Sequence, residues 1–462
     1  MAVWVRDKRF YRVFFSLALT IALQNLVVFS VNLADNIMLG AYQETSMGGV
    51  ALVNQIQFLL QMLVMGAGEG VIVLAAQYWG KGQTDPIRRV IAIGMAVGLT
   101  ASVALGAIVF CFPHGCLRLL TNDESLIAEG ARYLRIICFT YPLFAMTNIL
   151  LCSLRSVETV RIGFVVSLST LCINVTLNAI LIYGRLGAPE MGVRGAATAT
   201  LIARAVEFLI VLGYIKLRDQ KLRLRIRDFF RLDRRLLKDY VRHGLPVILS
   251  NTSWGIAMFL QTAILGHMGK TAVTANSIAT TVFQIMTVVS YGAASSAAVV
   301  IGKTVGEGRL DTARQYAKTL QVLFLLIGVA TGTALFACRD VVLSFYTVSS
   351  ASLQLARTFM TVLSVTAIGT SYQMAVMTGI LRGGGTTRFT LINDMIFIWG
   401  VVLPSAFLSA FVFHLSPVIV FCCLKCDQIL KCGVAVIKVN RGKWIRTVTR
   451  DTKVPDIGEA EA

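Results

Sequence analysis

The chain has 462 residues, of which 56% are hydrophobic and only 15% are charged, with a formal net charge of +19. Soluble domains carry roughly 25% charged residues, so this composition excludes an ordinary soluble globular protein. Long apolar runs recur along the whole sequence, which is typical of an all-α polytopic membrane protein. The alternating segments of about ten residues that mark a transmembrane β-barrel are absent from the sequence.

Apolar runs separated by short polar loops predict about twelve membrane-spanning helices. The first run is too long for a signal-peptide core and lacks a small-residue cleavage pattern, so we expect it to stay in the protein. The last span is interrupted by Lys425, Asp427 and Lys431. In chain order, the predicted helices cover residues 12–40, 49–78, 88–112, 126–154, 162–184, 192–216, 244–266, 272–302, 315–338, 352–381, 389–413 and 416–437.

Asp35 lies in the second half of the first apolar run, Val13 to Gly40. An ionised carboxylate at the centre of a bilayer costs about 2.5–3.5 kcal/mol on insertion scales. An acid kept inside a span despite this cost predicts a proton or cation site that faces a cavity. The alternative is an acid near the end of the span, reached by interfacial water or capping a break in the helix.

The basic residues crowd into alternate loops, which is the positive-inside pattern of an inner (plasma) membrane protein. This placement predicts a lipid bilayer, and no nucleic acid, as the partner of the positive charge. Both termini and the basic linker from Lys216 to Arg242 are then cytoplasmic. The loops predicted to face outward lie near Glu44, Asp123, Glu190, Lys270, Ser349 and His414.

The two halves of the chain share polar and glycine positions at a constant offset. Gly80-x-Gly82-x-x-Asp85 recurs as Gly306-x-Gly308-x-x-Asp311, always 226 residues later. We infer two pseudo-symmetric six-helix bundles, related by an axis along the membrane normal, with a cavity between them. The predicted divisions are a first lobe (1–217), a basic cytoplasmic linker (218–242), a second lobe (243–438) and a polar, disordered cytoplasmic tail (439–462).

Several stretches together resemble the multidrug and toxic compound extrusion (MATE) family of transporters, over nearly the whole chain. The resemblance implies a V-shaped pair of six-helix lobes and efflux of organic compounds driven by a proton or sodium gradient. The stretches are NLADNIMLG (32–40), AAQYWGKGQTD (75–85), LCSLRS (151–156), INVTLNAILIYG (173–184), MGVRGAATATLIAR (191–204), HGLPVIL (243–249) and LRGGGTTRF (381–389).

The resemblance implies roles for five side chains of the first lobe. Asp35 matches the helix 1 acid that couples cations, and Asn148, Asn174 and Asn178 match polar positions that line the cavity beside it, to which we add Asn32. Asn174 and Asn178 are four apart, so helical spacing alone lets both point at one site. The alternative role for membrane asparagines is interhelical hydrogen bonding, which contributes about 0.6 kcal/mol on average.

The sequence also departs from the family pattern. NorM-type members carry a Glu where Trp254 stands and an Asp where Gly385 stands, so the second-lobe sodium site is missing and the resemblance favours the DinF-type branch. Some members have a second acid in place of Asn178, and many have a proline near Thr20. The absence of that proline puts any proline-dependent bending of helix 1 in doubt.

Two further acids fall within apolar segments. Glu69 either lines the cavity or caps a glycine-rich break, and Asp394 either approaches the second-lobe cavity or pairs with a neighbour such as Arg388. Arg204 and Glu207 are three apart and are predicted to pair. Cys423 and Cys426 form a lone C-x-x-C without the four ligands of a zinc site, so no metal is expected.

No Walker motif or clustered catalytic set is present, so neither ATP, another cofactor nor an enzyme activity is expected. The prediction is a monomeric secondary antiporter that exports small amphipathic or cationic organic compounds in exchange for protons or sodium ions. The alternative is a lipid-linked precursor flippase of the same wider superfamily. Such a flippase would line its cavity with basic residues, whereas most strong cations of this chain lie in loops.

Overall fold

The computed structural model describes residues 4–230, 233–346 and 348–450. This part of the chain is built from α-helices with short 3-10 and π-helical segments, and it contains no strand. The predicted all-α fold is therefore confirmed. Within the described residues, ten helices are long and apolar enough to cross a membrane, and a bent pair makes an eleventh.

The first bundle follows the predicted order, with one helix broken in two. The predicted span 126–154 is bent by 53° between its two halves. The break has a local cause, because Pro142 cannot donate a hydrogen bond to the carbonyl of residue 138 and its ring crowds that carbonyl. The elements are α1 (Lys8–Tyr42), α2 (Glu44–Gly80), α3 (Thr84–Cys111), α4 (Pro113–Arg118), α5 (Glu124–Ile137), α6 (Thr140–Ser156), α7 (Arg161–Leu181), η1 (Arg185–Gly187) and α8 (Val193–Leu217).

The second bundle begins with a short basic helix in the linker. The last predicted span, 416–437, is divided at Cys426 into α16 and α17, next to the charges that weakened it in the sequence. The elements are η2 (Ile226–Phe230), α9 (Arg234–His243), α10 (Leu245–His267), α11 (Lys270–Gly306), α12 (Leu310–Leu343), α13 (Ser350–Met374), η3 (Ala375–Leu381), α14 (Thr387–Met395), η4 (Ile396–Val402), α15 (Leu403–Phe407), η5 (Leu408–Val412), α16 (Pro417–Lys425) and α17 (Asp427–Arg441).

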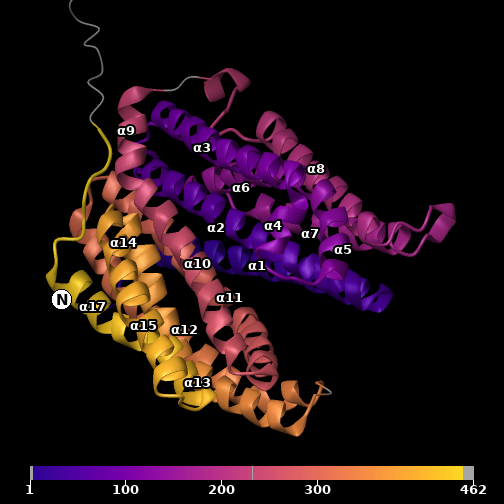
Figure 1. Cartoon of the computed structure of the whole chain (residues 1–462). Helices are drawn as coiled ribbons and strands as arrows, with labels where there is room; N and C mark the ends of the chain where they lie inside the picture. Colours follow the sequence, from indigo (N-terminus) through magenta and orange to yellow (C-terminus); the bar gives the residue numbers. More distant parts are fainter. Residues whose placement is uncertain (1–3, 231–232, 347, 451–462) are drawn as a thin grey trace, which may run out of the picture.

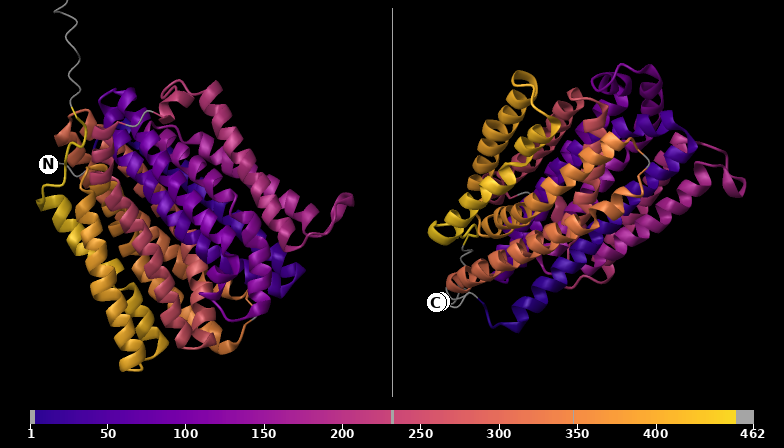
Figure 2. Two further views of the ribbon diagram at one scale, coloured as in Figure 1. Left: turned by 45° about the horizontal axis from the view of Figure 1, so that its top comes forward. Right: turned by 90° about the horizontal axis from the view of Figure 1, so that it is seen from below.

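The bundles lie side by side, converge at the end that carries α9 and α14, and diverge toward the other end (Figure 1). Both views of Figure 2 show the same pairing of an indigo-to-magenta bundle with an orange-to-yellow one. The lobes pack against each other through α2, which contacts α10 and α11, and through α1, which contacts α11. A Cβ on Gly66 would meet the Ile248 backbone at 2.6 Å, so the helices touch there without an intervening side chain.

Two glycines at the convergent end are related by the sequence repeat. A Cβ on Gly80 would overlap the carbonyl oxygen of Lys303, and a Cβ on Gly306 would overlap that of Gln77. Both pairs carry the offset of 226 residues, so the two contacts are equivalent under the pseudo-symmetry. Gly82 and Gly308 follow with positive φ values of 71° and 77°, a conformation that glycine adopts without strain. The motif is thus the place where the two lobes meet.

The chain after α17 differs from the expected disordered tail. Residues 442–450 run along the convergent end, and Trp444 and Val448 are only 3% and 6% exposed. These two apolar side chains anchor an otherwise polar segment, which composition alone did not reveal. The remainder of the predicted tail, 451–462, lies outside the described residues, and the lobe boundaries stay predictions.

We predict that Gly80→Ala lowers the thermal unfolding midpoint of the purified protein in detergent. The added methyl group meets backbone, which cannot rotate away, and such overpacking costs about 1–3 kcal/mol. Gly306→Ala should behave alike because its contact is equivalent. Gly213→Ala in α8 is the matched control, since its Cβ would enter open space and alanine favours the helix. Equal midpoints for all three variants would contradict the close crossing.

Candidate functional site

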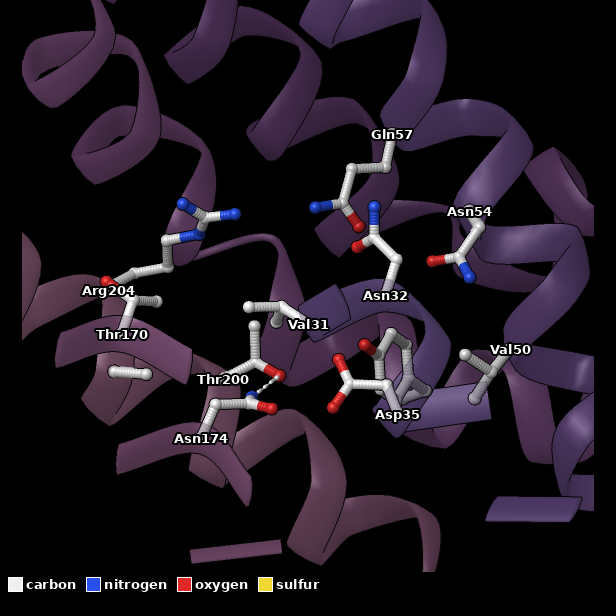
Figure 3. Close-up of a pocket in the computed structure, with 12 residues that line it drawn as sticks. Val31, Asn32, Asp35, Val50, Asn54, Gln57, Thr170, Asn174, Thr200 and Arg204 are labelled. Carbon is white, nitrogen blue, oxygen red and sulfur yellow. Dashed lines mark hydrogen bonds between the residues drawn. The ribbon is translucent and has the colours of Figure 1, made fainter. Parts of the chain in front are cut away.

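Asp35 of α1 is held by a line of polar side chains from α7 and α8. Asn178 donates from Nδ2 to Asp35 Oδ1 and also to Asn174 Oδ1, 3.1 Å away. Asn174 in turn donates to Thr200 Oγ1 at 3.2 Å, the bond drawn in Figure 3. Both asparagines are 0% exposed. The predicted pairing of these two amides with one acid is therefore the arrangement found, although their role in transport stays a prediction.

One atom of this line is left without a partner. Asn178 Oδ1 is buried and accepts no hydrogen bond from any described residue. A buried amide oxygen without a protein donor is costly, so a water molecule or another hydrogen-bond donor is favoured beside it. A protonated carboxyl group could supply this donor, because it carries an O–H that the ionised form lacks.

A small cavity adjoins Asp35, with space of about 30 Å³. This space admits a water molecule or a small cation and excludes a drug-sized organic compound. In the view of Figure 3, Asn32, Asn54 and Gln57 lie above Asp35, whereas Asn174 and Thr200 lie to its left. The residues that line it are Val31, Asn32, Asp35, Val50, Asn54, Gln57, Tyr133, Thr170, Asn174, Thr200, Ala203 and Arg204.

Sequence reasoning missed Asn54, Gln57, Tyr133 and Thr200. The first two are three apart on α2 and so share a helix face, which is a usable signal. Tyr133 and Thr200 carried no signal, because only the packing of α5 and α8 brings them to α1.

A buried cation stands at the edge of the same cavity. Arg204 lines it and pairs with Glu207 through a 2.6 Å contact between Nη1 and Oε2. The side chains are 15% and 8% exposed, so the predicted pair is confirmed as a buried one. Glu207 pairs with Arg204, but the charge of Arg204 still acts on the carboxylate of Asp35 across the shared cavity, in addition to the amide donors.

Asn148 does not line this cavity. Its Oδ1 accepts a weak hydrogen bond from the Cys152 thiol at 3.7 Å, and it lies against Gly68 of α2. The prediction that groups Asn148 with Asp35 is therefore not met by the geometry. Its surroundings are those of a helix contact between α2 and α6.

Glu69 belongs to a second polar cluster, which joins the two lobes. Glu69 Oε2 on α2 lies 2.7 Å from Nη1 of Arg382, which follows η3 in the second bundle. Asn251 on α10 contacts both, donating to Glu69 at 3.0 Å and accepting from Arg382 at 3.2 Å. Glu69 is therefore neither a helix cap nor a residue of the Asp35 cavity. It is the acidic half of an interlobe ion pair.

Asp394 belongs to the same cluster and is connected to Arg382 through Ser250. Ser250 accepts from Arg382 Nη2 at 3.0 Å and donates to Asp394. Lys431 Nζ then lies 3.1 Å from Asp394 and 3.2 Å from Asp427. The suggestion that Asp394 pairs with Arg388 is wrong, because Lys431, one turn after Asp427 on α17, occupies that place. Most strong cations were expected in loops, but Arg382 and Lys431 are buried, with exposed fractions of 3% and 4%.

Paired helical bundles, membrane-length apolar helices and a buried acid with amide partners define a membrane transporter fold. The family model MatE matches residues 20–180 and 246–408, which is most of both bundles. The chain belongs to the MATE family, a family of membrane transporters rather than enzymes.

Curated relatives align over most of their length. A probable multidrug resistance protein NorM of Thermotoga maritima is 26% identical over 454 residues, covering 96% of this chain and 95% of the relative. The multidrug resistance protein MdtK of Pectobacterium atrosepticum is 27% identical over 409 residues, covering 86% of each. An uncharacterized transporter of Bacillus subtilis, YisQ, is 23% identical over 401 residues, covering 85% of this chain and 86% of the relative.

Solved structures share the fold. A structure described as MATE in complex with MaL6 superposes with a TM-score of 0.82 at 21% identity, covering 92% of this chain and 95% of that one. A transporter of the MOP superfamily from Pyrococcus furiosus gives a TM-score of 0.82 at 22% identity, covering 92% and 94%. At this identity the likeness concerns the fold alone.

We predict that Arg382→Met lowers the thermal stability of the purified protein. The side chains of Arg382 and Glu69 are 4% and 33% exposed, so removing the guanidinium leaves a partly exposed carboxylate uncompensated, which costs less than the about 3–5 kcal/mol of a fully buried pair. Glu69→Gln in the Arg382→Met background should recover part of the loss. Arg314→Met is the control, since its pair with Asp311 is 61% and 90% exposed. If Arg314→Met and Arg382→Met unfold at the same temperature, the interlobe pair is not a structural element.

Proposed function

We propose that this MATE protein is a secondary active antiporter that exports amphipathic, often cationic organic compounds in exchange for an inward-moving cation. The observation that carries the proposal is the hydrogen-bonded line from Asp35 to the buried Asn178 and Asn174, beside a cavity of about 30 Å³. Relatives named multidrug resistance proteins support the class of exported compound. The cavity suits the coupling ion, and the organic substrate must bind elsewhere.

Coupling follows from the change of charge at Asp35. Ionised Asp35 is stabilised by the N–H donor of Asn178, and the charge is expensive to carry into an apolar environment. Binding of a proton neutralises the acid and gives it an O–H that the free Oδ1 of Asn178 can accept. The two protonation states therefore favour different hydrogen bonds, which allows ion binding to bias the packing of α1 against α7.

Of the two candidate ions, we favour the proton. Asn178 turns its NH₂ group toward Asp35, and a partly positive NH₂ group repels a metal ion. Hard cations prefer several oxygen ligands, whereas here one carboxylate oxygen is taken by an N–H donor. Proton coupling through Asp35, with Trp254 and Gly385 in place of second-lobe acids, is also the basis for proposing the DinF-type branch.

The remaining candidate residues receive separate roles. Asn32, which lines the Asp35 cavity, belongs to the ion path, whereas Glu69 and Asp394 serve the interlobe cluster. The flippase alternative needs cations free to hold phosphates. Within the described residues, buried Arg204, Arg382 and Lys431 each pair with a carboxylate, which supports the antiporter.

We predict that Asp35→Asn abolishes gradient-driven efflux without reducing the thermal stability of the protein. Asparagine preserves the shape of the side chain but cannot titrate. Efflux is measured in proteoliposomes with a fluorescent organic cation, energised first by a proton gradient and then by a sodium gradient. Wild-type protein should respond to the proton gradient.

Asp311→Asn is the matched control, because it removes an acid that is 90% exposed in the first turn of α12. It should transport at the wild-type rate. A wild-type rate from Asp35→Asn would refute the coupling role, and a response to sodium alone would refute the choice of ion.

We propose that the protein lies in the inner (plasma) membrane as a monomer, with both termini and the Lys216–Arg242 linker cytoplasmic. Lys and Arg resist translocation, and short loops without them cross readily. We predict that single cysteines replacing Glu190 or Lys270 react with an impermeant reagent added outside intact cells, in a cysteine-free background. A cysteine replacing Arg227 should react only after lysis. Strong labelling at Arg227 in intact cells would invert the topology and the direction of transport.

A further inference from the structure

The segment 442–450 lies against the second bundle through backbone pairing and one aromatic side chain. Arg446 N donates to Gly384 O at 2.7 Å, and the Thr386 hydroxyl donates to Trp444 O. The Trp444 ring packs directly on Gly384, where a Cβ would lie 2.6 Å from the ring. The first half of the segment is therefore seated on the turn after η3, at the convergent end of the lobes.

The second half of the segment contacts the first bundle. Val448 N donates to Gln77 Oε1 at 2.9 Å, and the Val448 side chain joins the core of α2, α3 and α9. Arg450 N donates to the hydroxyl oxygen of Tyr78 at 3.3 Å. The Arg450 guanidinium makes two contacts with Asp239 of α9, at 2.6 and 2.8 Å.

Gln77 is the residue at which both lobes and the segment meet. Its side chain is 0% exposed, and its Nε2 donates to Gly383 O of the second bundle and to Arg446 O, both at 3.2 Å. Its Oε1 accepts from Val448, so the donor and the acceptor of the amide are both used. A buried amide satisfied in this way loses several partners at once when the segment leaves.

We propose that the surface formed by Gln77, Tyr78, Asp239 and the Gly383–Gly385 turn is a docking site for an extended peptide, and that its occupant is the chain's own segment 442–450. The bound segment holds the two lobes together at the convergent, cytoplasmic end. An antiporter must open this end once per cycle, so the segment leaves one lobe in each cycle. This inference rests on the proposed antiport function.

The first bundle is the side from which the segment detaches. On the second bundle it continues α17 and buries Trp444. On the first bundle it holds Val448, hydrogen bonds to Gln77 and Tyr78, and an ion pair in which Arg450 is 46% exposed. Exposed ion pairs contribute little to stability, so the Arg450 contact opens readily. The docked segment thus acts as a clasp that stays attached to the second lobe and releases the first.

The test is a distance between the lobes, measured by pulsed electron paramagnetic resonance in nanodiscs. Spin labels replace Asp85 and Asp311, equivalent acids in the first turns of α3 and α12 that are 62% and 90% exposed, in a cysteine-free background. A chain ended after Arg441 should gain a longer-distance population, increased several-fold over the wild type. A chain ended after Arg450 is the matched control and should keep the wild-type distribution.

Full-length variants provide the second measurement, which does not depend on truncation. Val448→Asp places a charge in a site that is 6% exposed and should also lengthen the distance, whereas Thr447→Ala, an exposed neighbour, should not. Unchanged distances in both the Arg441-ended chain and Val448→Asp would overturn the proposal. Absence of ion-driven efflux from the wild type would instead overturn the antiport function, and the distance measurement would still decide whether the segment clasps the lobes.

Discussion

The arrangement of this protein depends on one constraint, that a charge or polar group buried between apolar helices must find its partner inside the protein. Lipid offers no hydrogen bonds, so unpaired groups are expensive. The constraint gives the second bundle its chain of Arg382, Asp394 and Lys431, in which every charge faces an opposite one. Asp35 is treated differently, because its direct contact is with the amide of Asn178, while Arg204 acts on it only across the cavity. An acid that is solvated but not neutralised stays able to change its protonation state.

The fold was largely predictable because apolar length and loop charge act locally. The span predicted at 162–184 is observed as Arg161–Leu181, and that at 192–216 as Val193–Leu217. The break between α5 and α6 was also within reach, since Pro142 stands in the sequence at the place where a straight helix cannot continue. Residues 442–450 were not predictable, because their order depends on Gln77, which lies far away in sequence and meets them only in the folded chain.

The site was predictable only in part, for a related reason. Asn174 and Asn178 were found because both lie on one helix, where spacing fixes their common face. Partners from different helices are decided by packing, so the sequence did not pair Glu69 with Arg382 or Asp394 with Lys431. Asn148, which family resemblance grouped with Asp35, lies against Gly68 of α2, and its role stays a prediction.

The equivalent glycine crossings at Gly80 and Gly306 have a mechanical consequence. Backbone touches backbone there, so the lobes rotate about this joint more easily than they slide past it. A helix of the length of α2, 37 residues, reaches roughly 55 Å from such a pivot. The 1.5 Å rise per residue of an α-helix sets this length. A rotation of α2 by about 10° about the joint therefore displaces its far end by roughly 10 Å. While segment 442–450 keeps the convergent end closed, movements too small to disturb the packing at Gly80 are therefore large enough at the other end to admit or release an organic molecule.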